Sequence, residues 1–185
     1  WLRLADSIGV LTVGSMAIEC MDMPIETPYL PQRVESEITE AILRDRNHPS
    51  IVQWELFNEI RRPVLANMLK PMSLKARQLD PTRLILDESG GWAEGANLYL
   101  PYSTKAFKFN DIHNYPGPNI NNNKFDGFLT IGKTSAENKR LGLKARTPGR
   151  NVVPNIPSYV SEIGYGSLPD LSLIHISEPT RPREI

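Results

Sequence analysis

The sequence is poor in the groups that build disulfides, metal sites and charged surfaces. Cys20 is the only cysteine, so no disulfide can form within the chain and no cysteine cluster can hold a metal. The 21 basic residues balance the 21 acidic ones, so no basic field exists to attract nucleic acid or an anionic membrane. No apolar run approaches the length of a membrane span. A neutral ligand such as a sugar remains compatible with this composition.

Glycine-rich phosphate loops and histidine clusters are also absent. No glycine-rich loop follows any expected strand, which argues against the dinucleotide-binding and P-loop folds. His48 and His113 are far apart in the sequence, which argues against a zinc site and against a Ser-His-Asp triad. The sequence therefore predicts neither a metal nor a cofactor. His48 precedes an expected strand, so a structural role is expected for it.

Hydrophobic residues make up 40% of the 185 residues, which is the composition of a globular domain with a core. Apolar residues recur every four positions at Val34, Ile38 and Ile42, as in an amphipathic helix that the Asn-His-Pro segment at 47–49 ends. A second helix is expected over 64–79, with either a break or a new first turn at Pro71, and part of 136–143 is expected to be helical. A buried strand is expected at 7–13, after a helix end at 1–6, and further strands are expected at 51–59, 84–87, 109–113 and 156–162.

Strands that alternate with helices predict an α/β fold with a parallel sheet. About five strands are expected, whereas a closed (β/α)8 barrel has eight strands and typically about 250 residues. The sequence therefore predicts a partial (β/α)8 TIM barrel that is truncated at both ends. An open doubly wound sheet is the alternative architecture.

Two glutamates stand at the ends of expected strands. Glu59 closes the apolar run that begins at Ile51, and Glu162 closes the run that begins at Ile156. A carboxylate at the C-terminal end of a barrel strand points into the region where barrel enzymes perform chemistry. Two such carboxylates brought together are the groups that glycoside hydrolysis requires.

The segments around both glutamates resemble glycoside hydrolase family 2, which includes β-galactosidases, β-glucuronidases and β-mannosidases. Residues 43–52 (LRDRNHPSIV), followed by Trp54 and Asn58-Glu59, resemble the acid/base region of that family. Residues 160–166 (VSEIGYG) resemble its nucleophile strand. The order and separation of the two segments match the fourth and seventh barrel strands of the family, so the chain would span about strands 3 to 7.

The resemblance implies a retaining β-glycosidase that acts on a carbohydrate substrate, with Glu162 as the nucleophile and Glu59 as the acid/base. It also implies that Asn58 donates a hydrogen bond to the sugar 2-hydroxyl, that His113 contacts substrate and that Tyr115 hydrogen-bonds the nucleophile. Simple structural roles are the alternatives for His113 and Tyr115.

Trp92 follows an expected strand and is a candidate for stacking against a sugar, with a buried loop anchor as the alternative. A β-mannanase or cellulase of the same clan, or a carbohydrate-binding barrel without turnover, remain alternatives for the whole chain.

The two ends of the sequence limit what can be concluded. Residues 171–185 are similar to the translated reading frame of a common sequencing adapter, so a partial glycosidase barrel domain is expected over 1–170 and an artefact tail after it. The chain does not begin with Met, which leaves localisation open, and the oligomeric state is open as well. A fragment whose sheet has unpaired edge strands is expected to be inactive by itself.

Overall fold

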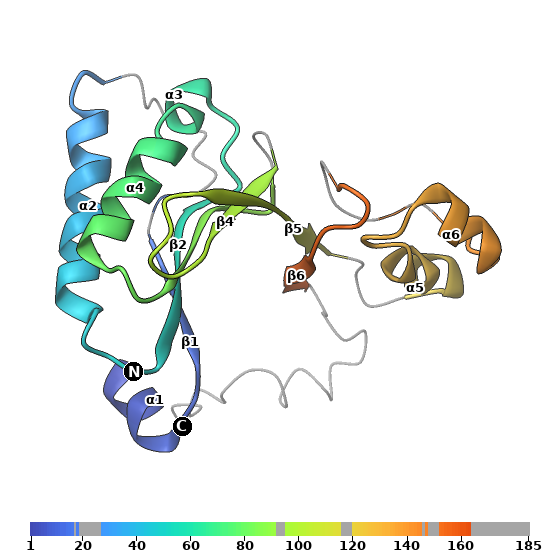
Figure 1. The fold of residues 1–185 in the computed structure, drawn as a ribbon, viewed down its shortest axis with the longest axis horizontal. Helices are drawn as coiled ribbons and strands as arrows, with labels where there is room; N and C mark the ends of the chain where they lie inside the picture. Colours follow the sequence, from blue (N-terminus) through green and yellow to red (C-terminus); the bar gives the residue numbers. More distant parts are fainter. Residues whose placement is uncertain are drawn as a thin grey trace, which may run out of the picture.

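The computed structural model describes residues 1–16, 18, 27–91, 95–115, 120–145, 147 and 152–163. Within these ranges six strands form one curled sheet in the order β1-β2-β3-β4-β5-β6 (Figure 1). The strands are β1 (Thr12–Ser15), β2 (Ile51–Asn58), β3 (Leu84–Ser89), β4 (Ala96–Tyr99), β5 (Ala106–Asn114) and β6 (Ser158–Ile163). The helices are α1 (Leu2–Ile8), α2 (Leu30–Asp45), α3 (Pro63–Ala66), α4 (Leu69–Leu79), α5 (Asn122–Leu129) and α6 (Ser135–Arg140).

The curled sheet is part of a TIM barrel, as the sequence predicts. The pairs β1–β2, β2–β3 and β5–β6 are parallel, so the C-terminal ends of these strands meet at one rim. Helices α2 and α4 pack against each other on the outside of β2 and β3, and α5 and α6 lie beyond β6 (Figure 1). This arrangement places every strand end that carries a candidate residue at the same rim.

Strand β4 is a departure from the expected alternation of strands and helices. It pairs antiparallel with both β3 and β5, so a short strand that was not expected from the sequence connects them in place of a helix. Asp87 holds it in place: Oδ1 accepts a hydrogen bond from the Asn97 backbone at 2.7 Å, and Oδ2 accepts one from Asn97 Nδ2 at 2.7 Å. Burial raises the pKa of Asp87 to about 6, although these hydrogen bonds oppose the shift.

The helix predictions are confirmed in part. Val34, Ile38 and Ile42 are buried along α2, as their spacing predicts. The helix expected over 64–79 is two helices that are separated at Asn67, so Pro71 is not the break but belongs to a new first turn, the other role expected for it. Pro71 lies in the first turn of α4, where a proline costs no helical hydrogen bond. Helix α5 was not expected from the sequence; it begins in an asparagine-rich segment, and the Asn121 side chain caps it by accepting a hydrogen bond from the Lys124 backbone.

The first strand is less buried than its apolar sequence suggested. It begins at Thr12, after α1 has ended at Gly9 in the left-handed conformation. The Val13 side chain is 46% exposed, so the prediction of a buried strand is wrong. The physical reason is the place of β1 in the sheet: it has β2 on one side and forms an edge of the described sheet.

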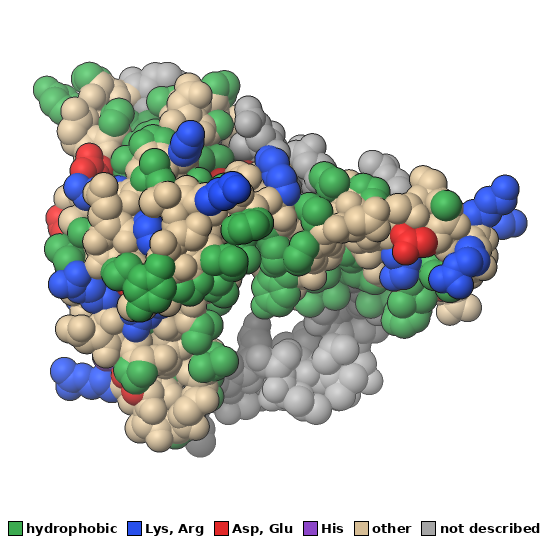
Figure 2. Space-filling view, viewed as in Figure 1, with side chains coloured by type: hydrophobic (Ala, Val, Ile, Leu, Met, Phe, Trp, Pro, Cys, Tyr) green, Lys and Arg blue, Asp and Glu red, His purple; other side chains and the backbone are tan. Residues whose placement is uncertain are grey.

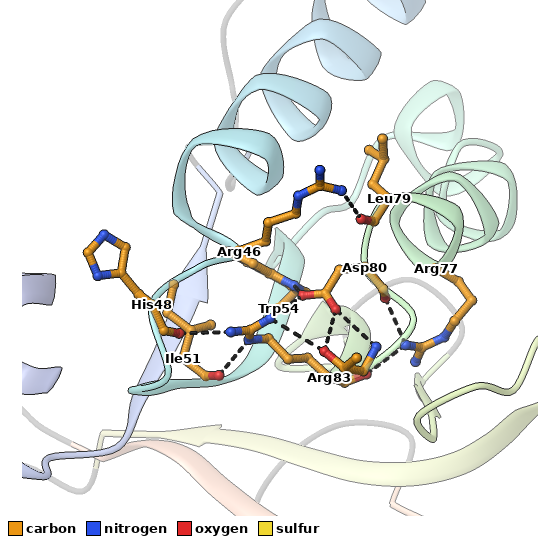
Figure 3. Close-up of polar contacts among 9 residues, drawn as sticks. Arg46, His48, Ile51, Trp54, Arg77, Leu79, Asp80 and Arg83 are labelled. Atoms are coloured by element: carbon orange, nitrogen blue, oxygen red, sulfur yellow. Dashed lines mark hydrogen bonds and ion pairs between the residues drawn. The ribbon is translucent and has the colours of Figure 1, made fainter.

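Buried polar groups tie the strands together at the rim opposite to the two glutamates (Figure 3). Asp80 is the centre of this network, because its Oδ2 accepts hydrogen bonds from Trp54 Nε1 at 2.8 Å and Arg83 Nη1 at 2.7 Å. Arg83 also donates to the backbone carbonyls of Ile51 at 2.6 Å and His48 at 2.8 Å. The network therefore fixes the beginning of β2 relative to the beginning of β3.

His48 belongs to this stabilising end of the barrel, where a structural role was expected. Its Nδ1 lies 2.5 Å from Oδ2 of Asp6, and the Ser50 backbone donates to Oδ1 of the same carboxylate at 2.9 Å. Arg77 contributes in a similar way, since its guanidinium donates to five backbone carbonyls, those of Asp80, Arg83, Tyr99, Leu100 and Ser103.

The indole of Trp54 requires a glycine on the neighbouring strand. A Cβ at Gly14 would lie 2.4 Å from Cζ3 and 2.5 Å from Cε3 of Trp54. The ring cannot retreat easily because it is buried and its Nε1 is bonded to Asp80. We therefore expect Gly14→Ala to lower the free energy of unfolding by about 1 to 3 kcal/mol through overpacking, measured by urea unfolding.

The control for this prediction is a double-mutant cycle with Trp54→Leu, which removes the ring that the new Cβ would meet. The cost of Gly14→Ala should be smaller in the Trp54→Leu background than in the wild type. An equal cost in both backgrounds would show that the ring contact is not the cause.

Figure 2 shows hydrophobic side chains and Lys and Arg side chains interspersed on one face. In the described ranges no helix combines the length and the apolar character that crossing a membrane requires.

Candidate active site

The fold brings the two strand-end glutamates to the same rim. Glu59 is the residue after β2, and Glu162 is the penultimate residue of β6. The Glu59 backbone has φ 48°, a left-handed conformation that residues other than glycine seldom adopt. Its N–H donates to the carbonyl of Ser89 at 3.1 Å, which holds this turn against the end of β3. Strained backbone of this kind is concentrated at functional sites.

His113, on β5, lies between the two carboxylates. Its Nδ1 is 2.7 Å from Oε1 of Glu59, and its Nε2 is 3.6 Å from Oε1 of Glu162. One ligand-type atom from each of the three residues lies within 4.8 Å of the others. One carboxylate oxygen of Glu59 therefore lies within 4.8 Å of one of Glu162, which is shorter than the roughly 6.5 to 9.5 Å between the carboxyl groups of inverting glycosidases.

The three side chains differ in their exposure to solvent. The His113 side chain is 1% exposed, Glu59 is 13% exposed and Glu162 is 39% exposed. The imidazole therefore forms the floor of the site, and Glu162 is the more accessible carboxylate. Tyr115, immediately after β5, donates its hydroxyl hydrogen bond to Oε2 of Glu162.

Asp111 is a buried acid below this cluster that sequence reasoning missed. Its Oδ1 accepts hydrogen bonds from Gly90 N at 2.7 Å and from Ser161 Oγ at 2.5 Å, and lies 3.6 Å from His113 Nε2. Burial raises the pKa of Asp111, although its hydrogen bonds oppose the shift. The residue ties the end of β3 to β5 and β6 directly beside Glu162. A signal was present, because Asp111 precedes His113 by two residues and so shares its face of the strand.

Asn58 and Glu55 form a second polar group at the rim, joined by Ser89. The Ser89 hydroxyl lies 2.6 Å from Oδ1 of Asn58 and 2.9 Å from Oε1 of Glu55. Ser15 donates to the same Glu55 oxygen at 3.1 Å. Burial raises the pKa of Glu55. Sequence reasoning missed Glu55, which lies inside β2 and has no neighbouring motif that marks it as a site residue.

Of the residues singled out in the sequence, Glu59, His113, Tyr115 and Glu162 meet in one cluster. Asn58 lies beside that cluster through its neighbour Glu59 and through Ser89. Trp92, the candidate for sugar stacking, lies outside the described residues.

The composition of the cluster also resembles a cation site. Glu59, His113 and Glu162 supply one imidazole and two carboxylates, which are ligand types that zinc accepts. The contact of 2.7 Å between Nδ1 of His113 and Oε1 of Glu59 is a hydrogen bond, whereas Nε2 of His113 has no hydrogen-bond partner among the described residues.

Comparison with known proteins agrees with this geometry. Residues 2–123 match the family model described as glycosyl hydrolases family 2, TIM barrel domain. The chain therefore belongs to glycoside hydrolase family 2, and its sheet is part of that family's TIM barrel.

Individual relatives share shorter stretches. The chain is 32% identical over 96 residues to a β-galactosidase of Photobacterium profundum, and 33% identical over 104 residues to one of Oenococcus oeni. Each match covers 49% of this chain and 9% of the relative, so the chain spans about a tenth of the length of these relatives.

Two solved structures share the fold over most of the chain. A β-glucuronidase of an uncultured Clostridium species is 18% identical, with a TM-score of 0.56 over 88% of this chain and 27% of that one. A GH2 β-galacturonidase of Eisenbergiella tayi, solved with bound galacturonate, is 18% identical, with a TM-score of 0.54 and the same coverage. At this identity the likeness concerns the fold alone.

Proposed function

We propose that this chain carries the reacting groups of a retaining β-glycosidase whose substrate class is the β-galactosides. The observation that carries the proposal is the meeting of Glu59 and Glu162 around His113 at one rim of a family 2 barrel, with one oxygen of each within 4.8 Å. The sugar class is supported by the β-galactosidases that are 32% and 33% identical to half of the chain.

Glu162 is the nucleophile in this proposal. Its carboxylate attacks the anomeric carbon, the bond to the leaving oxygen breaks, and a covalent glycosyl-enzyme forms. The hydrogen bond from Tyr115 to Oε2 leaves Oε1 available for the attack and keeps the carboxylate in one orientation. The exposure of Glu162, which exceeds that of Glu59 and His113, suits a group that must touch the substrate.

Glu59 is the acid and then the base. In the first step it gives its proton to the leaving oxygen, and in the second step it takes a proton from the water that cleaves the glycosyl-enzyme. His113 Nδ1 is hydrogen-bonded to this carboxyl group and therefore fixes its orientation through both steps. Asn58 donates to the sugar 2-hydroxyl, a contact that strengthens in the transition state.

The alternatives lose support to different degrees. Membership of family 2 replaces the hypothesis of a β-mannanase or cellulase from another family. A carbohydrate-binding barrel without turnover would also contact the sugar, but binding alone does not require two carboxylates that lie close together. We also propose that the barrel domain extends over 1–170 and that 171–185 is not part of it; residues from 164 onward lie outside the described part of the chain.

A panel of aryl β-glycosides tests the proposed function in the protein that carries this sequence. We expect the aryl β-galactoside to be hydrolysed with the highest kcat/KM and the α-galactoside to be inert. The 185-residue chain assayed alone is expected to be inactive, because its described sheet ends at β1 and β6 and does not close on itself. A preference for a β-glucuronide would refute the substrate class, and turnover of the α-galactoside would refute the stereochemistry.

A further inference from the structure

Ser89 stands between two groups that the structure presents as acceptors. Its Oγ lies 2.6 Å from Oδ1 of Asn58 and 2.9 Å from Oε1 of Glu55. A serine hydroxyl carries a single proton, so it can donate to only one of them. The other neighbouring group must then donate a proton of its own to the Ser89 oxygen, because two facing lone pairs at such a distance repel each other.

Two principal proton arrangements satisfy both contacts. In the first, Glu55 is a neutral carboxylic acid that donates to Ser89, and Ser89 donates to Oδ1 of Asn58. In the second, Glu55 is a carboxylate that accepts from Ser89, and the amide of Asn58 is turned by 180° so that Nδ2 donates to Ser89. Amide oxygen and nitrogen have nearly the same shape, so the hydrogen-bond network decides between the two orientations.

The environment of Glu55 favours the first arrangement. Burial disfavours its charged form, and the nearby acid Asp111 disfavours it further, while Ser89, Ser15 and His113 act in the opposite direction; the balance raises the pKa of Glu55. Glu59 and Glu162 add two more carboxyl groups to the same rim. A further negative charge here would be costly in a partly desolvated site.

We propose that Glu55 is a positioning residue that acts as a neutral carboxylic acid: it donates to Ser89, Ser89 donates to Oδ1 of Asn58, and the Asn58 amide is thereby held with Nδ2 available as a donor. This deepens the proposed function and rests on it for the role of Asn58, since a donor is what contact with a sugar 2-hydroxyl acceptor requires. The ionised form of Glu55 would present Oδ1 in place of Nδ2 and remove that donor.

The protonation of Glu55 can be measured without any assay of activity. Infrared difference spectra between the wild-type protein and Glu55→Gln, both near pH 7, isolate the carbonyl band of a protonated Glu55 from those of all other acids. We expect a protonated carboxylic acid band that Glu55→Gln removes. A carboxylate band in its place would overturn the proposal, whatever substrate the protein accepts.

Kinetic measurements test whether an uncharged hydrogen-bond donor at position 55 is sufficient for full activity. Glu55→Gln keeps a donor and carries no charge, so we expect kcat/KM within about threefold of the wild type. Glu55→Ala and Ser89→Ala should each lower kcat/KM about tenfold, the scale of one lost orienting hydrogen bond. The double variant should lose no more than either single variant, because both act through the Asn58 amide.

The outcomes separate this inference from the proposed function. Equal losses for Glu55→Gln and Glu55→Ala would contradict a neutral positioning role, and additive losses in the double variant would contradict the chain of contacts. Should no glycoside be hydrolysed at all, the proposed function fails, and the infrared measurement still decides the protonation of Glu55. Should Glu55→Ala fail to fold, the infrared spectra and the kinetics of Glu55→Gln still decide the protonation and the role of Glu55.

Discussion

Glu162→Gln is expected to lower kcat/KM for an aryl β-galactoside by about 10⁴-fold or more, the scale seen when a catalytic nucleophile is removed. The amide that replaces the carboxylate has no anionic oxygen to attack the anomeric carbon, so no glycosyl-enzyme forms. The amide is nearly isosteric and can still accept the hydrogen bond from Tyr115, so the fold and the binding of substrate should change little. Steady-state kinetics, with circular dichroism to verify folding, measure this effect.

Two controls make the result specific to Glu162. Glu37→Gln makes the same chemical change on an exposed position of α2, and it should leave kcat/KM unchanged. Glu162→Ala opens space on the face that the nucleophile occupied, so added azide should attack there and give the α-glycosyl azide from a β-glycoside. Unchanged turnover of Glu162→Gln, or a β-glycosyl azide from Glu162→Ala, would show that another group is the nucleophile.

Asp80→Ala is expected to lower the free energy of unfolding by about 3 to 5 kcal/mol, the cost of removing one partner from a buried ion pair. The change leaves the Trp54 indole N–H and the Arg83 guanidinium without the carboxylate that both of them bind (Figure 3). The register between the starts of β2 and β3 loses its main polar anchor. Urea unfolding monitored by Trp fluorescence measures this loss.

Asp80→Asn is the matched control, since it removes the charge and keeps the shape and one acceptor. Its cost should lie between zero and that of Asp80→Ala. Burial by itself would raise the pKa of Asp80, but hydrogen bonds from Thr82, Trp54 and Arg83 outweigh it and lower the pKa to about 2. The carboxylate therefore stabilises the fold above its unfolded pKa near 4, and this contribution is lost as pH falls toward 2. A wild-type protein that lost no stability over this interval while Asp80→Ala remained costly would contradict the ionic part of the argument.

The sequence could predict the parts of the fold that depend on local pattern. The spacing of Val34, Ile38 and Ile42 gave α2, because a buried stripe recurs with the helical period. The apolar run from Ile51 gave β2, and the position of Glu59 at its end followed from the same run. The site could be anticipated to the extent that Glu59, His113 and Glu162 each stand at or near the end of a strand.

The rest depends on contacts between segments that are distant in the sequence. Strand β4 has only four residues and no periodic pattern, and it is held by the bond between Asp87 and Asn97. The break at Asn67 itself has no proline or glycine, and the sequence marks it only through Pro71 in the first turn of α4. Glu55 became a candidate only when the sheet placed Ser89 beside it, since an acid inside a strand has no local feature that identifies its partners.

Trapping the covalent intermediate is the most direct test of the claim that Glu162 and Glu59 perform a double displacement. A 2-deoxy-2-fluoro-β-galactoside with an activated leaving group lacks the 2-hydroxyl contact that stabilises both transition states. The activated leaving group offsets this loss in the first step only, so the glycosyl-enzyme forms faster than it is hydrolysed and should accumulate. Mass spectrometry of digested protein is predicted to find one fluorosugar per chain, on the peptide that contains Glu162. A label on another residue, or an unlabelled protein that releases inverted product, would contradict the account.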